Sequence, residues 1–153
     1  MATADRTYVD PSALLKLYIH EPESPAMNAW RRRTRGALPL APHGQLEIVN
    51  GICLAAFRHL IDAEAMGDAL ASFEEDQTDG RYAPADVLWR ATLKRAAEIS
   101  RAHTAALGCR TLDVLHVATA LELGLRVFVT FDRRQRQLAR VAGLRPVTPG
   151  AGG

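Results

Sequence analysis

Four acidic residues lie far apart in the chain but at comparable positions, where a strand is expected to end or a helix to begin. They are Asp10, Glu47, Asp113 and Asp132. Carboxylates brought together repel one another, so a cluster of them stays ionised only if a cation lies among them. With oxygen donors and no histidine or cysteine set, the expected cation is Mg²⁺ or Mn²⁺. Such an ion suits phosphodiester hydrolysis, because it polarises the phosphate and lowers the pKa of a bound water.

Each of these positions also allows a simpler interpretation. A carboxylate at the start of a helix caps the first turn and favours the helix dipole by roughly 0.3–1 kcal/mol. Two features favour a shared site instead. Asp10 and Asp132 follow apolar residues, which indicates that they emerge from a buried sheet rather than from a solvated face. If the sheet is parallel, all four acids also point toward one crevice.

Hydroxyl and amide residues lie close to the acids in the sequence. Ser12 and Thr130 are each two residues from an acid and could orient a carboxylate or a metal-bound water, although Ser12 could simply cap a helix. Asn50, one turn after Glu47, could bind phosphate or ribose, or could form a hydrogen bond within the core. We interpret His116 as a core histidine rather than a ligand.

Strands that alternate with helices are expected to position these residues. Strands are expected at 7–10, 37–40, 127–130 and 144–147, with a further one possible at 81–83. Helices are expected at about 12–18, 25–35, 46–60, 63–75, 86–103, 111–123 and 132–142. This alternation indicates an α/β fold in which helices cover both faces of a parallel sheet. Ligands of such folds bind beyond the carboxyl ends of the strands.

The helix expected at 46–60 has its apolar residues three and four positions apart, which predicts that this face is buried. These residues are Leu46, Val49, Ile52, Cys53, Ala56, Phe57 and Leu60. His43 is expected in the loop before the helix, so that it does not form a helical metal-binding pair with Glu47.

Length and composition limit the class of protein. The 153 residues are 48% hydrophobic and 24% charged, which is typical of one globular domain. No apolar run approaches the roughly 18 residues that span a bilayer, and no signal-peptide pattern is present. The two cysteines form no disulfide framework. We expect a cytoplasmic protein without membrane association, with one domain over 1–147 and a disordered tail over 148–153.

Four segments resemble, in order, the blocks of a known family. They are YVDPSALLKLY (8–18), LEIVN (46–50), RTLDVLHVATALELG (110–124) and VTFD (129–132). Their order and spacing resemble those of PIN-domain ribonucleases, and most closely those of VapC-type toxins of bacterial type II toxin–antitoxin systems. The resemblance implies a PIN-like three-layer fold with a short, mostly parallel sheet flanked by helices.

The resemblance also implies an activity and a set of roles. The chain is expected to be a Mg²⁺- or Mn²⁺-dependent endoribonuclease in which Asp10 and Asp113 are the principal metal ligands. Glu47 and Asp132 would complete the acidic site, and Thr130 matches a hydroxyl residue that often precedes the last acid by two. A homodimer is implied, with a VapB-type antitoxin whose tail enters the acidic groove. The implied substrates are structured RNAs, typically tRNA or ribosomal RNA.

Arginine provides 17 of the 19 basic residues and forms two clusters. Arg133, Arg134 and Arg136 follow the last acid, and we expect them to contact RNA phosphates rather than only to form a solvated helix face. The cluster at 31–35 matches no motif; it either places cations at a helix end or meets an acidic segment of the antitoxin.

Two other functions stay open. One is a structure-specific DNA nuclease of the PIN/5′-nuclease kind, and the other is a non-catalytic, PIN-like RNA-binding module. The presence of all four acids favours an enzyme, and the short chain favours RNA over DNA as the substrate.

Overall fold

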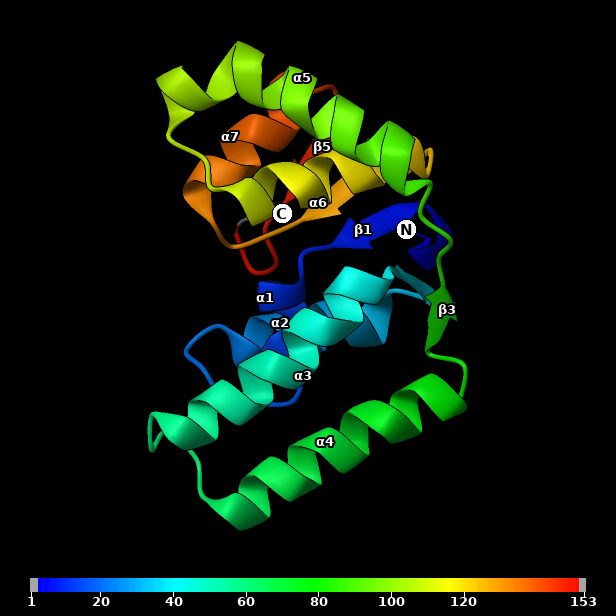
Figure 1. The fold of residues 1–153 in the computed structure, drawn as a ribbon. Helices are drawn as coiled ribbons and strands as arrows, with labels where there is room; N and C mark the ends of the chain where they lie inside the picture. The colour runs from blue at the N-terminus through cyan, green and yellow to red at the C-terminus, as the bar shows by residue number, and fades with distance from the viewer. Residues whose placement is uncertain (1–2, 152–153) are drawn as a thin grey trace.

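A three-stranded parallel sheet forms the centre of the computed structural model, which describes residues 3–151 (Figure 1). Its strands are β1 (Thr7–Val9), β4 (Val127–Val129) and β5 (Arg145–Val147), and β4 is the central one. In this register Tyr8 lies opposite Phe128, and Val129 lies opposite Val147. These strands are short runs of β-branched and aromatic residues, which are the types that fit a half-buried pleated surface.

A second parallel pair continues the sheet beyond β1. It consists of β2 (Leu38–Leu40) and β3 (Tyr82–Pro84), and β2 lies beside β1. A single bridge between Thr3 and Arg35 also connects this side of the structure. All strand pairs of the described residues are parallel, so the carboxyl ends of the strands lie at one edge.

Helices cover both faces of the sheet (Figure 1). One layer contains α1 (Pro11–Leu15), α2 (Ser24–Arg33), α3 (Pro42–Phe57) and α4 (Ala63–Thr78), and a short 3₁₀ turn, Ala4–Arg6, precedes β1. The other layer contains α5 (Trp89–Leu107), α6 (Thr111–Glu122) and α7 (Arg133–Val141). The predicted α/β fold with three layers is therefore confirmed.

Alternation along the strands divides the core into two clusters. Val9 and Val129 pack with the layer of α1 to α4, whereas Tyr8 and Phe128 pack with the layer of α5 to α7. Successive strand residues point to opposite faces of a sheet, so each three-residue strand contributes to both clusters.

Aspartates begin three of the helices. The side chains of Asp10, Asp62 and Asp132 accept backbone N–H groups at the starts of α1, α4 and α7. The expectation that Ser12 caps the first helix is wrong: Pro11 occupies the first helical position, where its missing N–H costs nothing, and the cap moves back to the aspartate. The predicted helix start at residue 86 is also wrong, because α5 begins three residues later.

The prediction for α3 is wrong in two respects. The helix begins at Pro42, so His43 lies in its first turn rather than in a loop. Most of the predicted buried face is exposed: Leu46 is 66% exposed and Phe57 is 79% exposed. The residues that α3 buries are Gly44, Ile48, Ile52 and Ala55. Small residues bring this face close to its neighbours; a Cβ atom on Gly51 would lie 2.9 Å from the Leu15 side chain of α1.

The chain end beyond β5 remains in contact with the sheet. Thr148 donates a hydrogen bond to the carbonyl oxygen of Thr130 and accepts one from Arg136. Residues 152–153, where the predicted tail ends, lie outside the described residues. None of the helices that the described residues form combines the length and apolarity needed to cross a bilayer.

Candidate active site

The four predicted acids line one cavity of about 550 Å³ at the carboxyl edge of the strands. Its lining consists of Asp10, Ser12, Glu47, Arg110, Thr111, Leu112, Asp113, His116, Asp132 and Gln135. The acids come from four different segments: the end of β1, the second turn of α3, the start of α6 and the start of α7. Parallel strand order brings these segments together, as the position of ligand sites in α/β folds predicts.

Asp10 is the most buried of the four acids, with 5% of its surface exposed. Burial raises the pKa of its carboxyl group, whereas His116 and hydrogen bonds from Ser12 and Gln135 oppose this effect. One carboxylate oxygen accepts from both the backbone N–H and the hydroxyl of Ser12. The other accepts from Gln135 Nε2 at 2.9 Å. The carboxylate is therefore held at both oxygens while it lines the cavity.

Glu47 is held by a buried histidine. His116 Nε2 lies 2.8 Å from Glu47 Oε2, and His116 Nδ1 lies 2.6 Å from the hydroxyl of Tyr8. Burial, followed by the charges of Asp10 and Glu47, raises the pKa of Tyr8, so its hydroxyl keeps its proton. Because the carboxylate can only accept, the Nε2–H of His116 donates to Glu47, and in a neutral ring Nδ1 then accepts from the Tyr8 hydroxyl. The prediction that His116 is a satisfied core histidine fits this geometry, but one of its partners is a site acid.

A second histidine supports the first. The rings of His43 and His116 stack with centroids 4.8 Å apart, and Trp89 packs edge-on against His43. His43 Nε2 lies 3.2 Å from Thr119 Oγ1, which itself donates to a backbone carbonyl and must therefore accept from the ring. Burial and the neighbouring His116 lower the pKa of His43 to about 4. His43 is thus a neutral ring that fixes the plane of His116.

Asp113 and Asp132 flank the cavity at two helix starts. The backbone N–H of Arg110 donates to Asp113, and the Arg110 guanidinium lies 3.5 Å from the same oxygen. Asp132 accepts the backbone N–H of Gln135 at 2.8 Å. Helix capping and membership of the acidic cavity, treated above as alternatives, therefore occur together at these residues.

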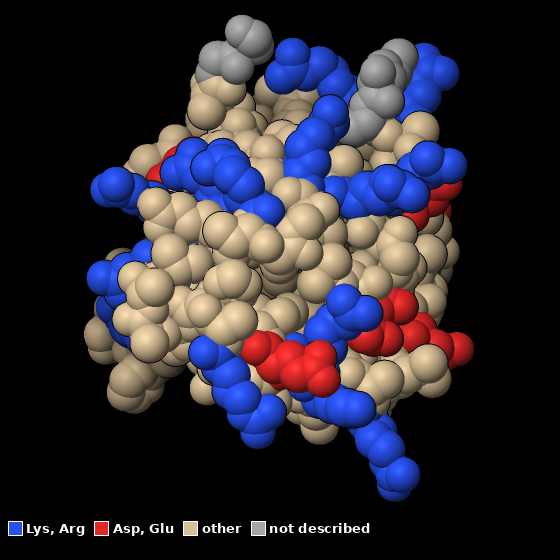
Figure 2. Space-filling view, turned by 90° about the horizontal axis from the view of Figure 1, so that it is seen from above, with Lys and Arg blue, Asp and Glu red and all other residues tan. Residues whose placement is uncertain are grey.

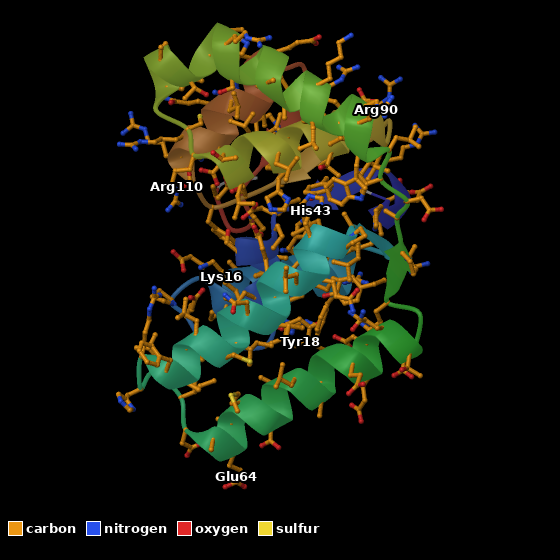
Figure 3. The ribbon with its side chains drawn as sticks, in the orientation of Figure 1. Lys16, Tyr18, His43, Glu64, Arg90 and Arg110 are labelled. Atoms are coloured by element: carbon orange, nitrogen blue, oxygen red, sulfur yellow. The ribbon has the colours of Figure 1, made fainter. Side chains whose placement is uncertain are left out.

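Arginines form a second cavity beside the first. It measures about 350 Å³ and is lined by Gly108, Arg110, Asp113, Asp132, Arg133 and Arg134. Arg110 is 83% exposed in its side chain and lies at the outer edge of the molecule next to α6, whereas His43 lies inside, between α3 and the upper helices (Figure 3). The two cavities share Arg110, Asp113 and Asp132, so they are neighbours. An anion bound in the arginine-lined cavity would lie beside the acids of the first cavity.

Basic side chains are not confined to this edge. Figure 2 shows lysines and arginines spread over the face above α5, with acidic side chains in small groups among them. On this face, positive charge alone therefore does not mark a nucleic-acid path; the arginines that line a cavity next to the acids are more informative.

The donor set fits a hard divalent cation by type. Four carboxylates face one cavity without a histidine or cysteine set, and oxygen donors are those that Mg²⁺ and Mn²⁺ prefer. The raised pKa of Asp10 also indicates a carboxylate that gains from a nearby positive charge. Among residues 3–151, no group of three or more acidic, histidine or cysteine side chains is already close enough to share an ion.

Three other predicted site residues line neither cavity. Thr130 is fully buried behind the cavity, where it accepts the backbone N–H of Asp132 and donates to Gln135. Asn50 is exposed and does not line the cavity, so the structure does not bring it into the site. Arg136 bonds to Thr148 and lines neither cavity.

Two residues in the site were missed by the sequence analysis. Gln135 is fully buried and bonds to Asp10, and Arg110 lines both cavities. Arg110 is the first residue of one of the segments that resemble the family, and Gln135 lies three residues after Asp132, in the first turn of a helix, where a capping aspartate accepts its N–H. Nothing in that spacing indicates where its amide points.

Three comparisons relate this chain to known proteins. The family model of the PIN domain matches residues 7–141. Ribonuclease VapC46 of Mycobacterium tuberculosis is 29% identical over 144 residues, which cover 93% of this chain and 96% of that protein. The crystal structure of FitAcB from Neisseria gonorrhoeae superposes with a TM-score of 0.66 over 95% of this chain and 99% of that one, at 17% identity. The last likeness concerns the fold alone.

Proposed function

This chain belongs to the PIN domain family, and on that premise we propose that it is a metal-dependent endoribonuclease, the toxin component of a type II toxin–antitoxin system. The observation that carries the proposal is the convergence of Asp10, Glu47, Asp113 and Asp132 on one cavity. Similarity to a ribonuclease along nearly the whole chain supports RNA as the substrate class. Structured RNA, such as tRNA or ribosomal RNA, is the proposed target.

Asp10 and Asp113 are the proposed ligands of a Mg²⁺ or Mn²⁺ ion, and Glu47 and Asp132 complete the acidic site. When bound, the ion polarises the phosphate and lowers the pKa of a water molecule. The chain's own residues hold the carboxylates for this task. Ser12 supports Asp10, and His116 holds Glu47 at the cavity wall.

Arg133, Arg134 and Arg136 are the proposed RNA-binding residues, with Arg110 added. Three of them line the cavity beside the acids, where an RNA strand entering the site would place its phosphates. Arginine suits this role because its planar fork binds phosphate oxygens in pairs.

A homodimer and a VapB-type antitoxin, whose tail enters the acidic groove, are the proposed partners. Apolar side chains that the monomer leaves exposed support an interface between copies: Leu46, Val49 and Phe57 on α3, and Leu88, Trp89 and Leu93 near the start of α5. Sedimentation of the purified chain tests the dimer. A single domain over 1–147 and a cytoplasmic location belong to the same proposal.

RNA cleavage tests the function directly. The purified chain is incubated with structured RNA, with single-stranded RNA and with flap DNA, each with Mg²⁺ or Mn²⁺ and then with chelator. We expect RNA cleavage that stops with chelator and is lost in Asp10→Asn and Asp113→Asn, both folded by circular dichroism. Asp68→Asn, an exposed acid on α4, is the matched control and should cleave as the parent does.

Three results would contradict the proposal. Preferential cleavage of flap DNA would point to a DNA nuclease. RNA binding without cleavage, together with no heat of metal binding in calorimetry, would point to a non-catalytic module. Full activity of Asp10→Asn would show that the assigned site is wrong.

A further inference from the structure

Gln135 is a glutamine with no exposed surface in the first turn of α7, and both ends of its amide are bonded. Its Nε2 donates to Asp10 Oδ1 at 2.9 Å across 125 residues of sequence. Its Oε1 accepts from Thr130 Oγ1 at 2.7 Å. A buried amide is costly unless both ends find partners, and here both partners are residues of the candidate site.

The orientation of this amide is fixed by a third bond. Thr130 Oγ1 accepts the backbone N–H of Asp132 at 3.0 Å, so the hydroxyl proton is available to Gln135 Oε1. An amide whose oxygen faces Thr130 must turn its NH₂ group toward Asp10. The backbone N–H of Gln135 also donates to Asp132, so a single residue connects the first and last acids of the cavity.

Asp10 depends on this donor because few others reach it. One of its carboxylate oxygens takes the two donors of Ser12, and the other takes Gln135. Without the amide, a carboxylate that is only 5% exposed would keep the two Ser12 donors on one oxygen but lose its one partner on the other, so only one of its oxygens would be held. With the amide, the oxygens keep one orientation toward the cavity.

We propose that Gln135 is the positioning residue for Asp10: its amide, oriented by the Thr130 hydroxyl, holds the carboxylate in the orientation that receives the divalent ion. This inference rests on the proposed function, because it assigns the ion to Asp10. It goes beyond that function because it names a residue on which the affinity of the site for the divalent ion depends. It also names the path of three hydrogen bonds that runs from the Asp132 N–H through Thr130 and Gln135 to Asp10.

Three substitutions separate positioning from packing. Gln135→Met keeps a side chain of similar length and removes the amide, Thr130→Val keeps the shape and removes the hydroxyl, and Thr130→Ser restores the hydroxyl. Mn²⁺ alone is titrated into each folded protein by calorimetry, without RNA. Partners that orient metal ligands contribute about 10–100-fold in metal affinity. We expect losses of about that size in Gln135→Met and Thr130→Val, and an affinity close to the parent's in Thr130→Ser.

Gln137→Met is the matched control, since it changes the same residue type on the same helix away from the cavity. Mn²⁺ affinity equal to the parent's in both Gln135→Met and Thr130→Val, while Asp10→Asn loses it, would overturn the inference. If Gln135→Met does not fold, the valine and serine variants of Thr130 decide the matter alone. If the parent protein itself does not bind Mn²⁺, the proposed metal site is contradicted as well. The titration of the parent therefore distinguishes failure of the proposed function from failure of the role assigned to Gln135.

Discussion

His116 Nε2 and Glu47 Oε2 lie 2.8 Å apart although 69 residues separate them in the chain. The histidine belongs to α6 and the glutamate to α3, so the pair joins the two helical layers at the wall of the acidic cavity. Tyr8, in strand β1, holds the other ring nitrogen. The position of Glu47 therefore depends on a buried chain of hydrogen bonds that begins in a core strand.

Removing the hydroxyl that begins this chain should affect both stability and activity. Tyr8→Phe leaves His116 Nδ1 buried without a donor, which should lower the free energy of unfolding by about 1–3 kcal/mol. The His116 ring also loses one of the two side-chain partners that orient it toward Glu47, so RNA cleavage should fall more than the folded fraction does. Urea denaturation and cleavage rates at saturating Mg²⁺ measure the two effects.

Tyr82→Phe is the control: it removes another buried tyrosine hydroxyl, bonded to Tyr18 away from the cavity, and should lower stability without lowering the cleavage rate. Equal rates in the two variants would contradict a role for Tyr8 in the site.

The stability of the protein should fall in mild acid because of His43. Its pKa in the folded state is about 4, lowered first by burial and then by His116, with Glu47 acting in the opposite direction. The unfolded chain binds a proton near the ordinary value of about 6.5, so between these two values only the unfolded state is protonated at this residue, and stability decreases as the pH falls. In His43→Phe, the difference between free energies of unfolding at about pH 7.5 and about pH 5 should be smaller than in the parent. An unchanged difference would show that His43 does not titrate in this way.

The salt dependence of RNA binding tests the arginine cavity. Each phosphate contact to a single strand contributes a slope of roughly −0.7 in a plot of log affinity against log salt. Arg133→Ala, made in the Asp10→Asn background to prevent cleavage, should make the slope shallower by about that amount. Arg140→Ala changes an exposed arginine in the last turn of the same helix and should leave the slope unchanged. Equal slopes in all three proteins, measured by fluorescence anisotropy with a short RNA, would remove Arg133 from the interface.

Arg31 should prove to be a structural residue. It is 6% exposed, and its guanidinium donates to three carbonyl oxygens, those of Thr34, Gly36 and Arg81. Arg31→Met should lower the free energy of unfolding by about 3 kcal/mol, because these bonds involve a charged donor in a buried place. Arg32→Met, on the exposed side of the same helix end, should have little effect. A reduced affinity for RNA in folded Arg31→Met would contradict this assignment.

The sequence was sufficient to predict the acidic cavity because the prediction follows from topology. Once strands and helices alternate, a parallel sheet places the residues after each strand at one edge. The positions of Asp10 and Asp132 at that edge follow from this topology alone. The same logic placed Glu47 and Asp113 at the starts of the next helices, which holds for Asp113, whereas α3 begins at Pro42 and Glu47 lies in its second turn. Their roles as metal ligands remain a prediction.

The residues that support the acids could not be predicted in this way. The bond between Tyr8 and His116 spans 108 residues, and the bond between Gln135 and Asp10 spans 125. Neither has a spacing or a motif that distinguishes it from ordinary core packing. The buried face of α3 was wrong for a related reason: periodicity finds an apolar stripe, but it cannot tell a stripe that meets the sheet from one that stays on the surface.

The place of β4 between β1 and β5 has a consequence for the order of synthesis. Strand β1 is made early, but its hydrogen-bonded neighbour β4, and with it Asp132 and Gln135, follows only after α1 to α6. A nascent chain therefore carries the first acids without the strand that aligns them. The proposed acidic site is incomplete until β4 and the start of α7 have been synthesised.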